Sequence, residues 1–88
     1  MITIRQPVLK QCPYRDEIDA GELVITLPGH AAPEYHYLAK QISALCQQPI
    51  THEDFHYAVV ALLPPDAIVA SSWNTGPFTI EISGDPHP

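Results

Sequence analysis

Prolines divide this chain into short segments, and this division limits the folds that it can adopt. Pro28-Gly29, Pro33, Pro49 and Pro64-Pro65 each stand at the end or start of an apolar run. Proline lacks the backbone N–H and fixes φ, so it stops or starts regular structure at such positions. Between these breaks the apolar spacing changes from alternation to a helical period. The sequence therefore predicts strands at both ends of the chain and two helices in its middle.

The strands at the start of the chain are expected in two places. Extended structure is expected over residues 2–5 and 8–9, followed by a strand over residues 22–27, which Pro28-Gly29 ends. The apolar face of this second strand holds Leu23, Ile25 and Leu27.

A terminal hairpin is expected at the other end. Residues 67–72 and 78–82 form its strands, with a turn at residues 74–76. Thr79 and Glu81 are expected to point outward. The side chains expected to point inward are Phe78, Ile80 and Ile82.

The two helices lie between these strands. Pro33 suits a first helical turn, and Pro49 ends the first helix. Thr51 and Asp54 fit a capping box at the start of the second helix. The first helix carries Tyr35, Leu38, Ile42, Leu45 and Cys46 near one face, and the second carries Phe55, Ala58, Val59, Leu62 and Leu63 at helical spacing.

The fold class follows from the order of the elements. The order ββααββ predicts an α+β protein in which an antiparallel four-stranded sheet has two helices on one face. With 88 residues, a single domain over residues 1–83 is expected, followed by a flexible tail at 84–88. Because so small a domain has a limited core, oligomerisation is expected. No export signal or membrane span is recognised, and two cysteines suit a reduced cytoplasm.

The acidic balance of the chain restricts its ligands. Four Lys and Arg residues against ten Asp and Glu residues give a formal net charge of -6. This balance disfavours autonomous nucleic-acid binding, which needs a cationic surface. The chain also lacks a glycine-rich loop for nucleotide phosphates. A small neutral ligand is easier to accommodate.

Cys12 and Asp19 are the best candidates for chemistry. They stand seven residues apart around one short loop, Cys12-Pro13 opening it and Asp19 closing it. An activated thiol is a nucleophile, and a neighbouring carboxyl group can protonate the atom on which charge develops. Free cysteines are more often small core residues, and Cys46 is expected to be one.

These positions carry a resemblance to a known family. Cys12-Pro13, Asp19, Glu34 and His52-Glu53, within the order ββααββ, resemble the QueF-type tunnelling-fold enzymes, which act on the nitrile of 7-cyano-7-deazaguanine. The spacing carries the resemblance, which covers about residues 12–82. It implies a tunnelling fold whose subunits close into an oligomeric barrel, with active sites at subunit interfaces.

The resemblance also implies roles for individual residues. Cys12 would add to the nitrile carbon to give a thioimide, and Asp19 would protonate the nitrile nitrogen. Glu53 would accept hydrogen bonds from the pyrimidine edge of the base, and His52 would line the same pocket. Glu34 and Tyr35 are candidates for the pocket wall.

Two departures from the family pattern decide between its reactions. The serine and lysine residues that grip NADPH in the reductases are missing after Glu34, where Lys40 is out of register, and residues 73–77 replace an arginine-bearing turn. These departures argue against NADPH and against the nitrile reductase of queuosine biosynthesis, which remains an alternative. They favour amidine formation without a cofactor, as in the archaeosine-type relatives that act on the base in tRNA. Free base and tRNA both remain open as substrates.

Two other functions compete with this one. His52-Glu53-Asp54-Phe55-His56 fits the His-Glu-x-x-His pattern of zinc peptidases, in which both histidines bind the metal. The third ligand would have to come from His36, Glu81 or His87, so no metal site is expected, and His56 is expected to face solvent. A noncatalytic tunnelling-fold module is the other alternative.

Overall fold

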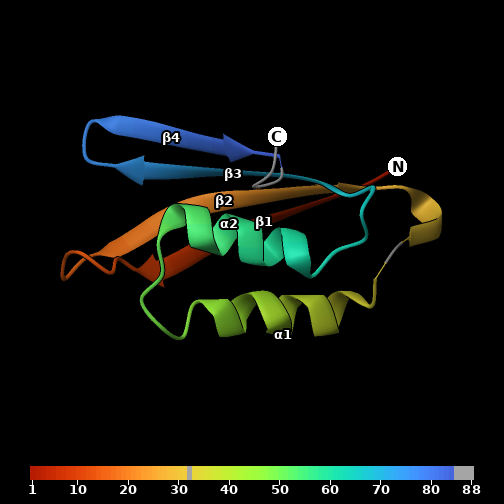
Figure 1. Ribbon diagram of the computed structural model, residues 1–88, viewed down its shortest axis with the longest axis horizontal. Helices are drawn as coiled ribbons and strands as arrows, with labels where there is room; N and C mark the ends of the chain where they lie inside the picture. Colours follow the sequence, from red (N-terminus) through yellow and green to blue (C-terminus); the bar gives the residue numbers. More distant parts are fainter. Residues whose placement is uncertain (32, 85–88) are drawn as a thin grey trace.

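The computed structural model describes residues 1–31 and 33–84, which form a four-stranded antiparallel sheet and two α-helices (Figure 1). The α+β class and the order ββααββ are therefore confirmed. None of the described helices is long and apolar enough to cross a membrane. The elements are β1 Ile2–Gln11, β2 Ile18–Leu27, the 3-10 turn η1 Gly29–Ala31, α1 Tyr35–Leu45, α2 His52–Ala61, β3 Ile68–Thr75 and β4 Phe78–Ser83.

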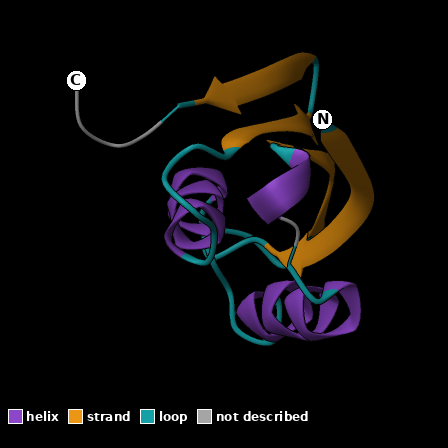
Figure 2. Cartoon of the chain, turned by 90° about the vertical axis from the view of Figure 1, so that its right-hand side faces the viewer, coloured by secondary structure: helices purple, strands orange, loops and turns teal. Residues whose placement is uncertain are grey.

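The strands follow one another across the sheet in the order β1-β2-β3-β4. Each strand is thus hydrogen-bonded to its neighbour in the sequence, and β1 and β4 form the two edges. Both helices lie on the same side of the curved sheet (Figure 2). The core between these layers is made by inward side chains of β1, β2 and β3 with Leu38, Ile42, Phe55 and Val59 of the helices.

The first hairpin is longer than the sequence pattern indicated. β1 is one continuous strand rather than two short pieces, and β2 begins at Ile18 rather than at residue 22. The ladder continues without a break from Ile2↔Leu27 to Gln11↔Ile18. Pro7 is tolerated within β1 because an edge strand can do without one ladder donor. Pairing between β1 and β2 extends both strands, and this pairing cannot be read from the spacing of residues within either strand.

The helices differ from expectation at three side chains. Glu34 is the N-cap of α1, so the helix begins at Tyr35 and Pro33 lies outside its first turn. Tyr35 is 49% exposed and does not join the core face. In α2 the Thr51 hydroxyl accepts a hydrogen bond from the Asp54 backbone N–H, which confirms Thr51 as the N-cap, whereas the return bond of a capping box is not found among the described residues. His56 is fully buried, so the expectation that it faces solvent is wrong.

The second hairpin turns at Gly76-Pro77, because Thr75 and Phe78 are paired, and not at residues 74–76. Gly76 has a φ of 57°, a conformation that glycine adopts without steric cost. Ile80 and Ile82 pack against the core as expected, whereas Phe78 is exposed. The carbonyl of Gly84, at the start of the expected tail, lies 3.0 Å from the His56 ring nitrogen Nε2. Residues 85–88 lie outside the described residues.

Candidate functional site

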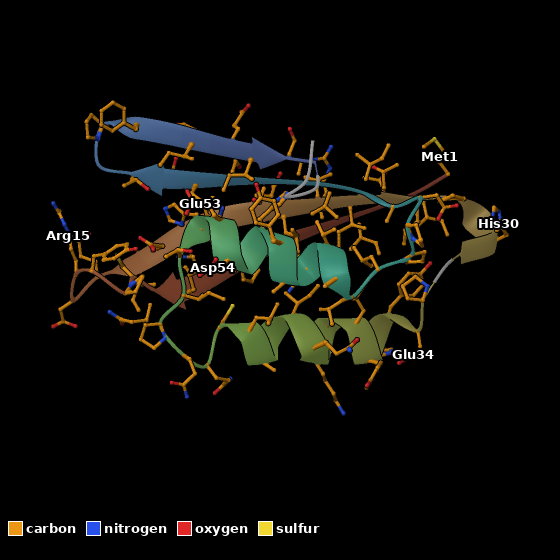
Figure 3. All side chains as sticks on the ribbon, in the orientation of Figure 1. Met1, Arg15, His30, Glu34, Glu53 and Asp54 are labelled. Atoms are coloured by element: carbon orange, nitrogen blue, oxygen red, sulfur yellow. The ribbon has the colours of Figure 1, made fainter. Side chains whose placement is uncertain are left out.

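A cavity of about 500 Å³ lies at the end of the sheet where three segments meet. The segments are the loop between β1 and β2, the N-terminus of α2, and the turn between β3 and β4. Figure 3 shows Arg15 from the first segment and Glu53 from the second toward the same end of the molecule. Residues far apart in the sequence therefore line one cavity, which is large enough for a small organic ligand.

Four of the six residues expected from the resemblance line this cavity: Cys12, Asp19, His52 and Glu53. The other two, Glu34 and Tyr35, do not line it, and Glu34 lies toward the opposite end of the molecule (Figure 3). Their contact with a ligand stays a prediction that requires a neighbouring subunit.

Cys12 follows the last residue of β1 and is a partly exposed free thiol. Its backbone N–H donates to the Glu17 carbonyl at 3.0 Å, and the Gln11 side chain donates to the Arg15 carbonyl at 3.0 Å. These bonds close the loop across its base. The thiol therefore belongs to a loop with a defined conformation, fixed by the end of the β1–β2 ladder.

Asp19 lies on the inner face of β2, 7% exposed, opposite Lys10 in the ladder. The Lys10 ammonium donates to Asp19 Oδ2 at 2.8 Å and to the Ile50 carbonyl at 2.6 Å. The pair thus lies at the inner wall of the cavity. Lys10 was not recognised as a site residue. Continuing the inward alternation of β1 from Val8 by two residues would have placed it there.

His52 is held on the same wall by an aromatic neighbour. Its ring is stacked on Trp73 with centroids 4.8 Å apart, and Nε2 lies 3.0 Å from the Thr75 hydroxyl. Burial, followed by the positive charge of Lys10, lowers the pKa of His52. The imidazole is therefore neutral at neutral pH. Its Nδ1 is buried without a hydrogen-bond partner among the described residues and lies 3.9 Å from Asp19 Oδ2.

Glu34 has a local structural function. Its carboxylate accepts hydrogen bonds from the backbone N–H groups of His36 and Tyr37 at the start of α1. Those two bonds, that of Tyr37 first, lower the pKa of Glu34. Cap formation accounts for this glutamate without a ligand.

The His-Glu-x-x-His pattern does not form a metal site in the described structure. The ring of His56 is engaged on both sides, with Nδ1 2.9 Å from the Ser71 hydroxyl and Nε2 3.0 Å from the Gly84 carbonyl. His52 instead reaches Thr75 on β3. Among residues 1–31 and 33–84, no three His, Cys, Asp or Glu side chains are grouped so that they could hold a metal ion. The peptidase alternative therefore lacks its ligand set within the described residues; His87, one of the expected third ligands, lies outside them.

The cavity brings together a thiol, an ion-paired carboxylate, a neutral imidazole and a second carboxylate, that of Glu53. The thiol can add to an electrophilic carbon, and the ion-paired carboxylate can transfer a proton. The imidazole and the second carboxylate can form hydrogen bonds with polar edges of a ligand. Comparison of the chain with protein-family models, with curated proteins and with solved structures found no match. Its function is therefore inferred from this geometry.

Proposed function

We propose that this protein is a tunnelling-fold enzyme that converts the nitrile of a 7-cyano-7-deazaguanine base to an amidine through a thioimide on Cys12. The observation that carries the proposal is the shared cavity of Cys12, Asp19, His52 and Glu53. These are the positions that the family resemblance assigns to the nucleophile, the acid and the base-binding residues. Cys12 and Asp19 flank the β1–β2 loop, whereas His52 and Glu53 begin α2, so sequence proximity alone does not explain why the two pairs meet.

In the first step the Cys12 sulfur attacks the nitrile carbon. The S–C bond forms while one bond of the C≡N group breaks, and the nitrile nitrogen receives a proton through Asp19. The proton that the thiol loses is the one that the nitrogen gains, so addition needs no external acid and releases no fragment. A positioned acid–base group contributes about 10²–10⁴-fold to such a step.

In the second step ammonia or another amine attacks the thioimide carbon. The new C–N bond forms, the C–S bond breaks, and the Cys12 thiol recovers its proton as the amidine leaves. No electrons are transferred, so this reaction needs no NADPH. Lys40, the one lysine near the family's cofactor-gripping position, lies on α1 and does not line the cavity.

Recognition of the base is assigned to the N-terminus of α2. The exposed Glu53 carboxylate can accept two parallel N–H donors from a guanine-like edge. The His52 ring, stacked on Trp73, lines the same cavity beside Glu53 and Asp19. Removing the Glu53 acceptor should weaken binding by about 1–3 kcal/mol, because the donors of the base would lose their partner.

Assembly into a barrel is part of the proposal. The sheet leaves β1 and β4 at its edges, and pairing of such edges between subunits would remove exposed backbone donors and acceptors. The cavity lies next to β1 and the β3–β4 turn, so a neighbour bound at an edge would help to cover it. Native mass spectrometry tests the assembly separately from the chemistry.

The chemistry is tested by the intact mass of the protein after incubation with 7-cyano-7-deazaguanine. We expect an increase of one whole base mass, because addition expels nothing, and loss of that increase in Cys12→Ala with retained assembly. Adding ammonia should then remove the adduct and release the amidine. Oxidation of added NADPH with release of an amine would favour the reductase alternative. No adduct, together with no binding by calorimetry, would refute the enzymatic proposal and favour a noncatalytic module.

A further inference from the structure

Lys10 carries a buried charge at a position where the fold does not need one. Its side chain has no exposed area. The same inner face of β1 carries Ile2, Ile4 and Val8, which pack into the core. Replacing a buried ion pair by well-packed apolar residues is often neutral or stabilising. A lysine at the cavity end of this face is therefore better explained by the site than by the stability of the sheet.

The contacts of Lys10 join the elements that surround the cavity. Its ammonium donates to Asp19 Oδ2 on β2 and to the carbonyl of Ile50, the residue before the N-cap of α2. The nitrogen also lies 4.9 Å from the centroid of the Trp73 ring on β3. These contacts satisfy the ammonium within the protein and fix its position.

The contact of Lys10 with Asp19 is made at one carboxylate oxygen. Both Lys10 Nζ, at 2.8 Å, and His52 Nδ1, at 3.9 Å, approach Oδ2. No hydrogen bond to the other oxygen, Oδ1, is found among the described residues, and Asp19 lines the cavity, so Oδ1 is free to accept a partner. Cys12 lines the same cavity as Asp19.

We propose that Lys10 is a positioning residue, which holds Asp19 as an oriented carboxylate so that Oδ1 can take the proton of the Cys12 thiol. On attack the S–H proton passes to Asp19, and Asp19 then delivers it to the atom that gains charge. The inference rests on the proposed function only for the identity of the electrophile. The departure of the thiol proton is the same for any electrophile.

The test is alkylation of Cys12 by iodoacetamide, measured by mass spectrometry of tryptic peptides over a range of pH. Cleavage after Arg15 and Lys40 places Cys12 and Cys46 on different peptides, so Cys46 serves as an internal control. Lys10→Met should slow alkylation of Cys12 at neutral pH by about tenfold, a modest part of the ~10²–10⁴ that a positioned base contributes. Lys10→Arg, which keeps the charge, should recover part of the rate. Lys40→Met removes an exposed lysine outside the cavity and should leave the rate unchanged.

A double variant separates positioning from folding. Lys10→Met with Asp19→Asn removes both charges, so it should be more stable to heat than Lys10→Met alone, which leaves Asp19 buried without its counter-ion. We expect its Cys12 to remain slow. A folded Lys10→Met protein, or a folded double variant, that labels at the wild-type rate would overturn the inference. The labelling experiment uses iodoacetamide and not the nitrile, so its result does not depend on the proposed reaction. If no nitrile adduct forms but Cys12 of Lys10→Met is still alkylated slowly, the proposed reaction is refuted and the role of Lys10 is supported.

Discussion

Gly21 lies opposite Trp73 in the β2–β3 ladder, and replacing it with alanine tests how closely the sheet is packed beneath that ring. Trp73 is 1% exposed and contacts the ring of Phe55 edge-on, with centroids 5.4 Å apart. A Cβ added at Gly21 would lie 2.5 Å from the Ser72 carbonyl oxygen, 2.8 Å from Cδ2 of Trp73 and closer still to the edge of that ring. No real Cβ tolerates contacts this short, so the ring or the strand must move.

The size of the effect follows from which atoms obstruct the new methyl group. One obstacle is a backbone carbonyl within the sheet, and the other is a ring held between Gly21, Phe55 and His52. Overpacking of a core costs about 1–3 kcal/mol, and we expect the upper half of that range because neither obstacle is the end of a flexible side chain. The entropic advantage of alanine over glycine, about 0.4–1 kcal/mol, is too small to compensate.

The assay is urea unfolding followed by tryptophan fluorescence. Trp73 is the only tryptophan, so its emission reports both unfolding and any movement of the ring in the folded state. Gly29→Ala is the matched control, because a Cβ there meets nothing within 4 Å. We expect a lower urea midpoint and shifted native emission for Gly21→Ala alone. Equal midpoints and equal emission in the two variants would show that the packing argument is wrong.

Three further predictions concern the helix cap, pH and nucleic acid. Thr51→Ala removes the bond to the Asp54 N–H, so urea unfolding should show a loss of about 1 kcal/mol, and an unchanged midpoint would contradict the cap assignment. Burial lowers the pKa of His52 below the ordinary 6.5, so the unfolded state binds a proton at this residue more readily than the folded state does. The stability that depends on neutral His52 is therefore present above pH 6.5 and is lost as the pH falls below it. The fall in unfolding free energy on acidification should be smaller in His52→Gln, and equal slopes in both proteins would refute this. Three of the four cationic side chains are paired with carboxylates, so a fluorescent RNA should show no salt-dependent binding by anisotropy, and tight binding at low salt would argue for a polynucleotide substrate.

The local sequence pattern predicted whether each element is a helix or a strand better than it predicted the first and last residues of that element. The helical spacing in α2 and the Thr51 cap were recognisable because they depend on residues within a few positions of each other. The full length of β1 and the early start of β2 were not, because they depend on the ladder between the two strands. Tyr35 and Phe78 have apolar character and suitable spacing but lie outside the core. The spacing of apolar residues indicates which face of a helix or strand is apolar. It does not indicate how much of that face the opposite layer of the fold covers.

The spacing of Cys12 and Asp19 and the family resemblance of His52-Glu53 selected four residues that line one cavity. Their roles toward a ligand stay predictions. Lys10 and Trp73 were missed because each has an ordinary structural explanation in the sequence, as a surface cation and a core aromatic residue. Their proximity to Asp19 and His52 comes from the cross-strand register and the docking of α2 on the sheet.

The sequence by itself determined the α+β class, the ββααββ order and the chemical groups available for a reaction, because these depend on composition and on short-range spacing. Only the tertiary structure decided which of these groups meet. It buried Lys10 against Asp19 and placed both ring nitrogens of His56 within hydrogen-bond distance of Ser71 and Gly84. It also left Glu34 at the far end of the molecule (Figure 3). The physical reason is that the pairing of strands and the docking of helices bring together residues far apart in the chain, and their burial then sets the charge and the partners of each group.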